Sequence, residues 1–223
     1  MSADNSRKSM ALFQETRGDP RQRYAEALSC YGGAGDAAYG NPPGFAARKA
    51  AAAVAFARVA ELPQETVDAL YFAGILHAVG AIGTDPASRT ARWDVPALGA
   101  GICARIPALP SSTANLIRWQ AECWDGTGYP DQLRWESIPL AAQFLLLAEM
   151  RLRAQDADEA FERVNAESGR SVAPAAAAVY AAWMLHVDGT IRTIAPPLHA
   201  IDASALENAI KQKHPMLRII AQA

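Results

Sequence analysis

The chain has 223 residues, of which 51% are hydrophobic and 20% are charged, and its net charge is −2. This composition is typical of a globular protein with one large domain or two small ones, and it argues against a low-complexity or disordered chain. The near-neutral charge argues against nucleic acid as a partner, because a phosphate backbone requires a surplus of Lys and Arg.

Most of the chain carries helical patterns joined by short connections. Residues 1–43 begin polar and include a short helical pattern from Pro20 to Cys30, which is followed by the loop-like stretch YGGAGDAAYGNPPG. Apolar residues, or small residues that allow close packing, then recur with the helical period in the segments 45–60, 64–78, 95–106, 112–123, 139–154, 157–168 and 173–186. No segment shows the sustained alternation of apolar and polar residues that predicts a strand.

The pattern changes beyond Val187. The stretch GTIRTIAPPLHAIDASAL allows one short strand before a final helix that starts at Ser204. Ser204 and Glu207 have the spacing of a capping box, in which each side chain accepts a backbone N–H of the first turn. We therefore predict an all-α helical bundle over residues 44–186, with residues 1–43 and 187–223 as N-terminal and C-terminal extensions.

The location of the protein is expected to be cytoplasmic. No apolar run reaches the roughly 18–20 residues that a membrane span needs, and the N-terminal stretch lacks the apolar segment of a secretory signal. Cys30, Cys103 and Cys123 are far apart and form no CxxC pair, which favours free thiols in a reducing compartment. We therefore expect no membrane binding, and the oligomeric state stays open.

The stretch ECWDGTGYPDQLRWESIPL, residues 122–140, predicts a shaped loop between two helices. Gly126 and Gly128 offer positions where positive φ is cheap, and Pro130 fixes φ and lacks a backbone donor. A loop of this kind can carry chemistry, recognise a partner, or serve only as a rigid turn, and the residues around it must decide.

Two segments together resemble the HD-GYP family, a branch of the metal-dependent phosphohydrolases with the HD domain. The first is AGILHAVGAIG, which ends the segment 64–78 and runs past it, and the second is RWQAECWDGTGYPDQLRWESIPLAAQFLLLAEM. The resemblance covers residues 44–183 and includes the late stretch EAFERVNAESGRSVAPAAAAVYAAW. It implies an HD-domain-like helical bundle, a bacterial signalling setting, and hydrolysis of cyclic di-GMP by a cluster of iron or manganese ions.

The chain departs from the family pattern at the metal ligands. The His-Asp pair of the family is His77-Ala78 here, its His-His-Glu run is Gln120-Ala121-Glu122, and its final Asp is Glu149. Three further family positions hold apolar residues, namely Phe45, Ala81 and Val95. A metal cluster needs several converging His and carboxylate ligands. Only His77 and Glu149 remain, with Glu122 and Asp125 nearby, so we predict no catalytic residues and no cofactor.

The former metal pocket is expected to be vestigial, formed by His77, Ala78, Glu122 and Glu149. The apolar residues at the ligand positions predict a pocket filled by side chains rather than a polar cavity. His77 is expected to be a core histidine hydrogen-bonded to the backbone. Glu149 is expected either to pair with His77 or to point to solvent at a helix end, and the sequence leaves both open.

The loop is interpreted as a partner-binding surface made by Asp125, Gly126, Gly128, Tyr129, Pro130 and Trp135. Trp and Tyr are enriched in binding hot spots, and four aromatic residues lie in or near this loop: Trp119, Trp124, Tyr129 and Trp135. Trp119 is expected to belong to the core and Tyr129 to be displayed at the loop apex. The resemblance implies a GGDEF-domain protein as a candidate partner.

Three functions therefore compete. The preferred interpretation is a catalytically inactive HD-GYP-like signalling protein that binds a partner through the loop. One alternative is a phosphodiesterase with a rearranged site built from His77, Glu122, Asp125 and Glu149, which would use iron or manganese. The other is a sensor that binds a nucleotide in the emptied pocket without turnover.

Overall fold

The structure is a computed structural model that describes residues 19–85, 91–187, 191, 194–212 and 214–215. The fold is all-α, as predicted, and no strand forms within these residues. The α-helices are α2 (Pro20–Tyr39), α3 (Phe45–Val59), α4 (Gln64–Ile75), α5 (Ala91–Cys103), α6 (Thr113–Trp119), α7 (Leu140–Arg153), α8 (Ala157–Glu167), α9 (Pro174–Val187) and α10 (Ala203–Lys211). Short 3₁₀ helices are η1 (Val79–Gly83), η2 (Trp135–Ser137) and η3 (Leu198–Ala200).

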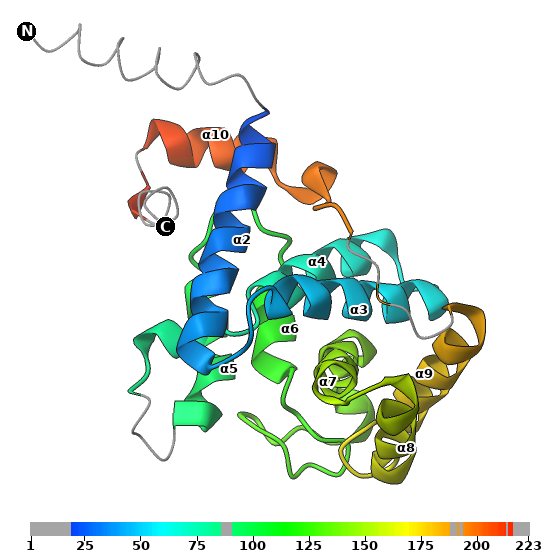
Figure 1. Cartoon of the computed structure of the whole chain (residues 1–223). Helices are drawn as coiled ribbons and strands as arrows, with labels where there is room; N and C mark the ends of the chain where they lie inside the picture. Colours follow the sequence, from blue (N-terminus) through cyan, green and yellow to red (C-terminus); the bar gives the residue numbers. More distant parts are fainter. Residues whose placement is uncertain (1–18, 86–90, 188–190, 192–193, 213, 216–223) are drawn as a thin grey trace, which may run out of the picture.

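Helices α3 and α4 form the centre of the bundle and run side by side (Figure 1). Helix α7 packs against α3, and the pair α8 and α9 covers one end of α7, while α2, α5, α6 and η1 pack together on the other side. The alanines of α3 allow the close approach: Ala50 is fully buried, and a Cβ on Gly74 of α4 would lie 2.4 Å from the Ala50 Cα. Small residues therefore bring the two central helices into backbone contact.

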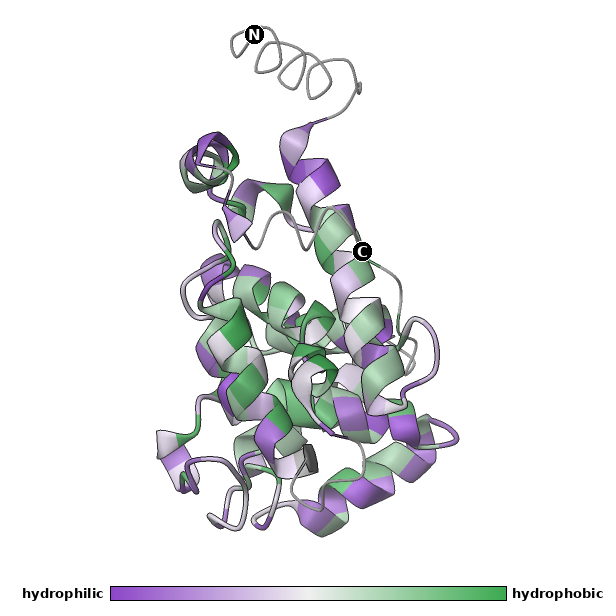
Figure 2. Cartoon of the chain, turned by 90° about the vertical axis from the view of Figure 1, so that its left-hand side faces the viewer, coloured by the Kyte–Doolittle hydropathy of each residue, from purple (hydrophilic) through white to green (hydrophobic). Residues whose placement is uncertain are grey.

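A cluster of aromatic rings fills the core where α3, α7 and α9 meet. The Phe56 ring lies 5.1 Å from Trp183, 5.5 Å from Tyr180 and 6.2 Å from Phe144, measured between ring centroids. All four side chains are fully buried, and such ring pairs add to the free energy of apolar burial. Figure 2 shows hydrophobic residues gathered among the central helices and hydrophilic residues on their outer faces.

Helix α2 is longer than predicted, because it continues through the glycines of the stretch YGGAGDAAY to Tyr39. The sequence predicts a loop at these glycines, but two of them serve close packing. A Cβ on Gly32 would lie 2.3 Å from the Ile75 carbonyl oxygen, and a Cβ on Gly35 would lie 2.9 Å from the Ala78 backbone. The cost of glycine in a helix is offset here by contact with η1 and the end of α4.

The C-terminal predictions need two corrections. The described part of residues 187–203 contains η3 but no strand, and residues 188–190 and 192–193 lie outside the description. Helix α10 begins at Ala203 rather than Ser204, and its N-cap is Asp202, whose carboxylate accepts the Ala205 N–H at 2.9 Å. Ser204 thus lies inside the helix, because the carboxylate two residues earlier already caps it.

The segment Gln64–Gly83 has the length and hydropathy of a membrane span, contrary to the expectation that no run would reach that length. Its most apolar window is 83% buried inside the protein. A core helix passes the same test, because its apolar residues are needed for packing on all sides. This segment is therefore weak evidence for a membrane span.

Candidate functional site

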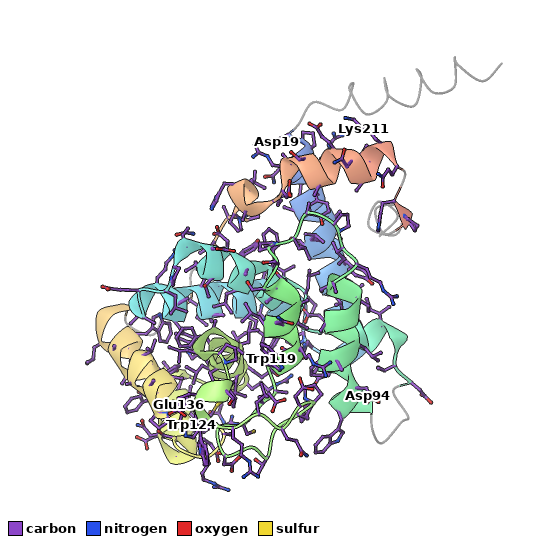
Figure 3. The ribbon with its side chains drawn as sticks, turned by 180° about the vertical axis from the view of Figure 1, so that it is seen from behind. Asp19, Asp94, Trp119, Trp124, Glu136 and Lys211 are labelled. Atoms are coloured by element: carbon purple, nitrogen blue, oxygen red, sulfur yellow. The ribbon has the colours of Figure 1, made fainter. Side chains whose placement is uncertain are left out.

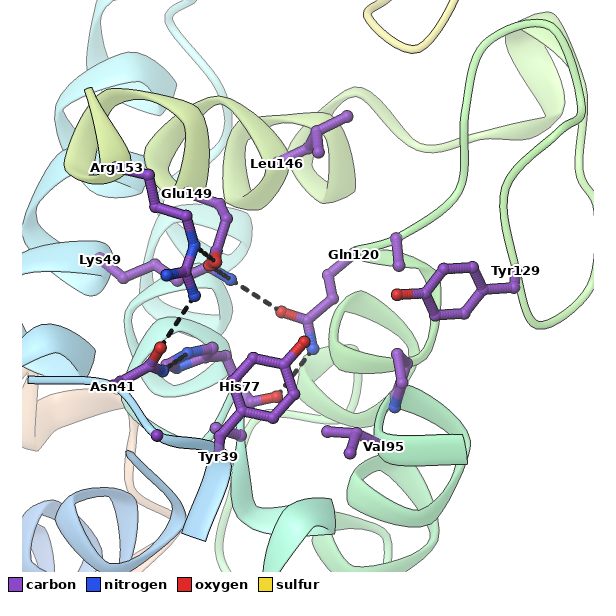
Figure 4. A pocket seen from close by; sticks show the side chains of 14 residues that line it. Tyr39, Asn41, Lys49, His77, Val95, Gln120, Tyr129, Leu146, Glu149 and Arg153 are labelled. Carbon is purple, nitrogen blue, oxygen red and sulfur yellow. Dashed lines mark hydrogen bonds and ion pairs between the residues drawn. The ribbon is translucent and has the colours of Figure 1, made fainter. Parts of the chain in front are cut away.

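A pocket of about 470 Å³ opens beside His77 (Figure 4). Its lining includes Ala78 and Val95, but most of the side chains at its base are polar or charged: Asn41, Lys49, His77, Gln120, Glu149 and Arg153. The prediction of a pocket filled by apolar side chains is therefore wrong. Phe45 and Ala81 are buried and do not line the pocket, so these two apolar residues do not contribute to its wall.

Five segments deliver these polar side chains. Lys49 lies on α3 one turn after Phe45, His77 follows the end of α4, and Gln120 follows the end of α6. Glu149 and Arg153 lie one turn apart on α7, and Asn41 lies in the connection between α2 and α3. Residues at i and i+4 share one helix face, so Glu149 and Arg153 of α7 both face the pocket, whereas α3 contributes Lys49 to its lining.

Lys49 is the central group of the pocket and was missed in the sequence. Its side chain is only 4% exposed, and its ammonium lies 2.9 Å from Glu149 Oε2 and 3.0 Å from Gln120 Oε1. The Gln120 amide in turn donates from Nε2 to the His77 carbonyl oxygen at 2.8 Å. A buried ammonium requires acceptors of this kind, because its charge would otherwise lack both solvent and partner.

Glu149 pairs with two cations rather than with His77, and its side chain is only 24% exposed, so neither expectation for it holds. Its other oxygen, Oε1, accepts from Arg153 Nε at 2.5 Å. Burial alone would raise the pKa of Glu149, but Lys49 and Arg153 favour the carboxylate and lower its pKa to about 2. Arg153 also donates from Nη2 to Asn41 Oδ1 at 2.9 Å and lies over the Phe45 ring.

His77 is a buried histidine hydrogen-bonded to the backbone, as predicted. Its Nδ1 lies 3.0 Å from the Gly74 carbonyl oxygen, which assigns the proton to Nδ1. Its Nε2 is then the acceptor for the Asn41 amide at 3.3 Å. Burial and the nearby Lys49 charge hold the pKa of His77 well below its usual value. His77 is therefore neutral at neutral pH.

Asp36, at the end of α2, supports this arrangement from behind. It is almost fully buried, and its carboxylate accepts from Asn41 Nδ2 at 3.0 Å and from the Ala46 N–H at 2.7 Å. Burial raises the pKa of Asp36, although these two hydrogen bonds oppose that shift. Asp36 thus ties the first turn of α3 to the segment that holds Asn41.

The residues of the pocket do not fit a metal cluster. Within the described residues, no group of three or more His, Cys, Asp and Glu side chains converges on one point. Glu149 is the only carboxylate lining the described pocket, and both of its oxygens are engaged by Lys49 and Arg153. A divalent cation would have to displace an ammonium and a guanidinium and then bind beside their charges, which is unfavourable.

Glu122 and Asp125 do not reach the pocket, so the four residues of the rearranged site do not come together. Glu122 is fully buried beneath the loop, where its carboxylate accepts the Asp131 N–H at 2.6 Å and the Leu133 N–H at 2.9 Å. The Asp125 carboxylate accepts from the backbone N–H and the hydroxyl of Thr127, and these bonds lower the pKa of Asp125. Both acids shape the loop backbone.

The two glycines of the loop act in different ways. Gly126 has a φ of +80°, as predicted, and it is one residue after Asp125 in the turn. Gly128 does not have positive φ; a Cβ there would lie 2.1 Å from the Cys123 nitrogen and 2.5 Å from the Glu122 Cα. Gly128 is therefore required because two backbone segments touch. The Tyr129–Pro130 peptide bond is cis.

Tyr129 is not displayed at a loop apex, contrary to prediction. It is half-buried, lines the pocket, and its ring lies 4.8 Å from the ring of Trp93. Figure 4 shows its hydroxyl pointing into the pocket toward Gln120. The exposed aromatic side chains near this loop are instead Trp93, 55% exposed, and Trp135, 57% exposed.

Two further tryptophans near the loop, Trp119 and Trp124, pack against the core. Trp119 is partly buried against the core, which agrees in part with its prediction, and its Nε1 donates to Asp131 at 2.8 Å. Asp131 also accepts two hydrogen bonds from Arg118. Figure 3 shows Trp124 beside Glu136 at the edge of the view and Trp119 nearer its centre. The hydrogen bonds from Arg118 and Trp119 to Asp131 tie the loop to the end of α6.

The missed residues carry only weak signals in the sequence. Lys49 stands among alanines on a helix face that also carries Phe45 and Phe56. A charged residue within an apolar stripe is the one sequence signal for a buried, paired lysine. Arg153 follows Glu149 by four residues, which is the spacing of a helical ion pair. Nothing local marks Asn41, whose partners His77 and Arg153 come from distant segments. Asp36 pairs with Asn41 and with the Ala46 N–H, both in the stretch that follows α2.

Comparison with known proteins places the chain in a family. No curated protein matches the whole sequence significantly. The structure is similar to a cyclic GMP-AMP specific phosphodiesterase of V. cholerae, with a TM-score of 0.65 and 20% identity over 83% of this chain. The match covers 57% of that longer chain, and at this identity it establishes a shared fold. Residues 39–168 match the family profile described as HD domain. The chain therefore belongs to the HD domain family.

Proposed function

We propose that this chain is a degenerate HD-GYP domain that does not hydrolyse phosphodiesters and acts in bacterial signalling by binding. The observation that carries the proposal is the Lys49 ammonium, which lies between Glu149 and Gln120 at 2.9 and 3.0 Å. Both are residues of the family's metal-ligand positions. A positive charge fixed to the chain occupies the acceptors that a metal ion would need.

The described lining of the pocket lacks the groups that would activate a water molecule for attack on a phosphodiester. Hydrolysis by a metal cluster depends on lowering the pKa of a bound water and on clamping phosphate oxygens between cations. An ammonium cannot coordinate water as a Lewis acid, and His77 is held neutral with its Nε2 engaged by Asn41. Besides His77, Glu149 is the only His or carboxylate side chain in the described lining that could act as a general base, and two cations stabilise that carboxylate. The pocket is suited to binding and not to activating water.

The test is metal content and turnover of the purified full chain. Protein expressed with added iron and manganese should contain far less than one metal ion per chain by elemental analysis. Incubation with cyclic di-GMP should leave the substrate intact by chromatography, and Lys49→Val should not create activity. Two metal ions per chain, with turnover that His77→Ala abolishes, would overturn the proposal.

A second candidate function is protein binding through the loop at residues 122–140, and it stays a prediction. Its support is the exposure of Trp135 in the loop, at 57%, and of Trp93, at 55%, whose ring packs on Tyr129 of the loop. Large rigid aromatic side chains of this exposure are frequent anchors of interfaces. The candidate partner remains a GGDEF-domain protein, as the family resemblance implies.

Trp135→Ala tests this second candidate directly. Its affinity for a purified GGDEF-domain protein from the same cell should fall by about tenfold or more, as expected for an interface anchor. The matched control is Trp124→Phe. Trp124 packs against the core, and phenylalanine keeps an aromatic ring there, so this variant should bind the partner as wild type does. Equal binding by wild type and Trp135→Ala would exclude the loop as the contact.

A further inference from the structure

We propose that the pocket is an anion site in which Lys49 and Arg153 bind the phosphate of a small phosphate monoester of nucleotide type, without a metal ion. This inference rests on the proposed function, because it requires a pocket free of a metal cluster. It adds a ligand class and names the two side chains that would recognise it.

The two cations of the pocket have hydrogen-bond donors that the described part of the chain does not use. The side-chain acceptors at its base are already engaged: both oxygens of Glu149, Gln120 Oε1 and Asn41 Oδ1 each accept a hydrogen bond. Lys49 uses two of its N–H donors on Glu149 and Gln120, and Arg153 uses Nε and one Nη2 donor. The remaining N–H groups of these cations have no acceptor among the described residues. The two cations therefore keep N–H donors for a ligand, whereas each of these acceptor oxygens already holds one donor.

The charges of the lining residues also favour an anion. Among the lining residues, Lys49 and Arg153 are cationic and Glu149 is the single carboxylate, while His77 is neutral. The nearby Asp36 is not part of the lining, and burial raises the pKa of its carboxyl. An anion is the charge that this wall lacks, and a guanidinium beside an ammonium suits phosphate oxygens in particular.

A phosphate monoester fits better than a diester for electrostatic reasons. A monoester carries close to two negative charges at neutral pH, because its second pKa is about 6, whereas a diester carries one. The two cations of the pocket therefore gain more from the monoester. At about 470 Å³ the pocket lies within the usual size of small-molecule sites.

The rim of the pocket supports a ligand with a flat ring. Tyr39 and Tyr129 both line the opening, and Trp93 packs on Tyr129 with their ring centroids 4.8 Å apart. Aromatic side chains of this kind stack on nucleobases with little regard to sequence. A phosphate on the cations and a base at the tyrosines would fill both regions of the site.

The experiment is calorimetric titration of the full, metal-free chain with AMP and GMP, with adenosine and inorganic phosphate as matched partial ligands. A nucleoside monophosphate should bind at least tenfold more tightly than adenosine and more tightly than cyclic di-GMP. Binding should weaken as salt rises, because the contact is ionic, and it should be unchanged by EDTA.

Variants then assign the site. Arg153→Gln should weaken AMP binding by tenfold or more, and Arg153→Lys should retain part of it. The control Arg58→Gln makes the same change in net charge on an exposed part of α3, away from the pocket, and should bind as wild type. Glu149→Gln should bind AMP more tightly by several fold, because it removes the competing carboxylate; a metal-bridged ligand would show the opposite change.

The outcomes separate the two proposals. Binding that EDTA abolishes and that Glu149→Gln weakens would overturn both the anion site and the loss of the metal cluster. Metal-free protein that binds none of the nucleotides, or that binds them equally after Arg153→Gln, would overturn the anion site alone.

Discussion

The pocket and the loop at residues 122–140 both carry parts of the resemblance to the HD-GYP family, yet they match its pattern to different degrees. In the pocket the sequence departs from that pattern at Ala78, Gln120 and Ala121, and Lys49, Arg153 and Asn41 join Glu149 and Gln120 into a connected network. In the loop the pattern residues remain, and most of them hold the backbone: Glu122 accepts two backbone N–H groups, and Gly128 allows two segments to touch.

The loop residues that match the family pattern have structural roles of their own. Survival of the loop pattern is explained in large part by the fold, because changing Glu122 or Gly128 would leave unpaired N–H groups or a steric clash. In the pocket, by contrast, the buried Lys49 and Glu149 charges are paired with each other. The polar network of the pocket therefore says more about function than the loop pattern, which by itself does not establish recognition.

The largest expected effect is that of Gly128→Ala, which tests whether the loop is held by packing. The added Cβ would meet backbone atoms of Cys123 and Glu122, which cannot rotate away, so we expect a loss of about 3 kcal/mol or more in the free energy of unfolding. Urea denaturation measures it. The control Gly33→Ala, on α2 with open space around it, should gain about 0.5–1 kcal/mol.

The next effect tests the network of the pocket. Glu149→Ala should lower the free energy of unfolding by about 3 kcal/mol, because it leaves the buried Lys49 ammonium without its carboxylate. Lys49→Met should cost less, since Glu149 keeps Arg153 as a partner. The double variant should be more stable than Glu149→Ala alone. Purely additive losses would mean that the two side chains do not interact.

The pH dependence follows from His77. Its folded pKa lies below the unfolded value of about 6.5, so below pH 6.5 the unfolded chain binds a proton that the folded chain does not. Stability should therefore fall as the pH drops from 7 toward 5, by up to about 1.4 kcal/mol per pH unit from this group.

The variant His77→Gln should flatten this part of the profile, whereas the exposed His199→Gln should leave the fall in place. Denaturation at several pH values provides the measurement. An unchanged slope in His77→Gln would assign the effect to another group. Glu149 adds a separate loss only below about pH 4.5, because its folded pKa is about 2.

The smallest effect is expected for Trp135→Ala. Its side chain is 57% exposed, so the free energy of unfolding should change by less than about 1 kcal/mol. Trp119→Ala should cost about 2 kcal/mol, because it removes core contact and the hydrogen bond to Asp131. Equal losses in both variants would show that Trp135 is also part of the packed structure.

The helical fold could be predicted from the sequence because helix formation follows local periodicity. The segments that became α3, α4, α7, α8 and α9 carry the period and the small residues that bring helices together. The backbone-bonded His77 and the positive φ of Gly126 could also be predicted, since each depends on the residue itself or on its neighbours.

The tertiary structure alone decided the content of the pocket. Lys49 meets Glu149 across 100 positions of the chain, and Arg153 meets Asn41 across 112, so no local pattern could pair them. The direction of Glu122 into the loop, and of Tyr129 into the pocket, likewise depends on which backbone groups lie opposite. Periodicity determines which face of a helix is buried, but the partner of a buried charge is set by the segments that fold against it.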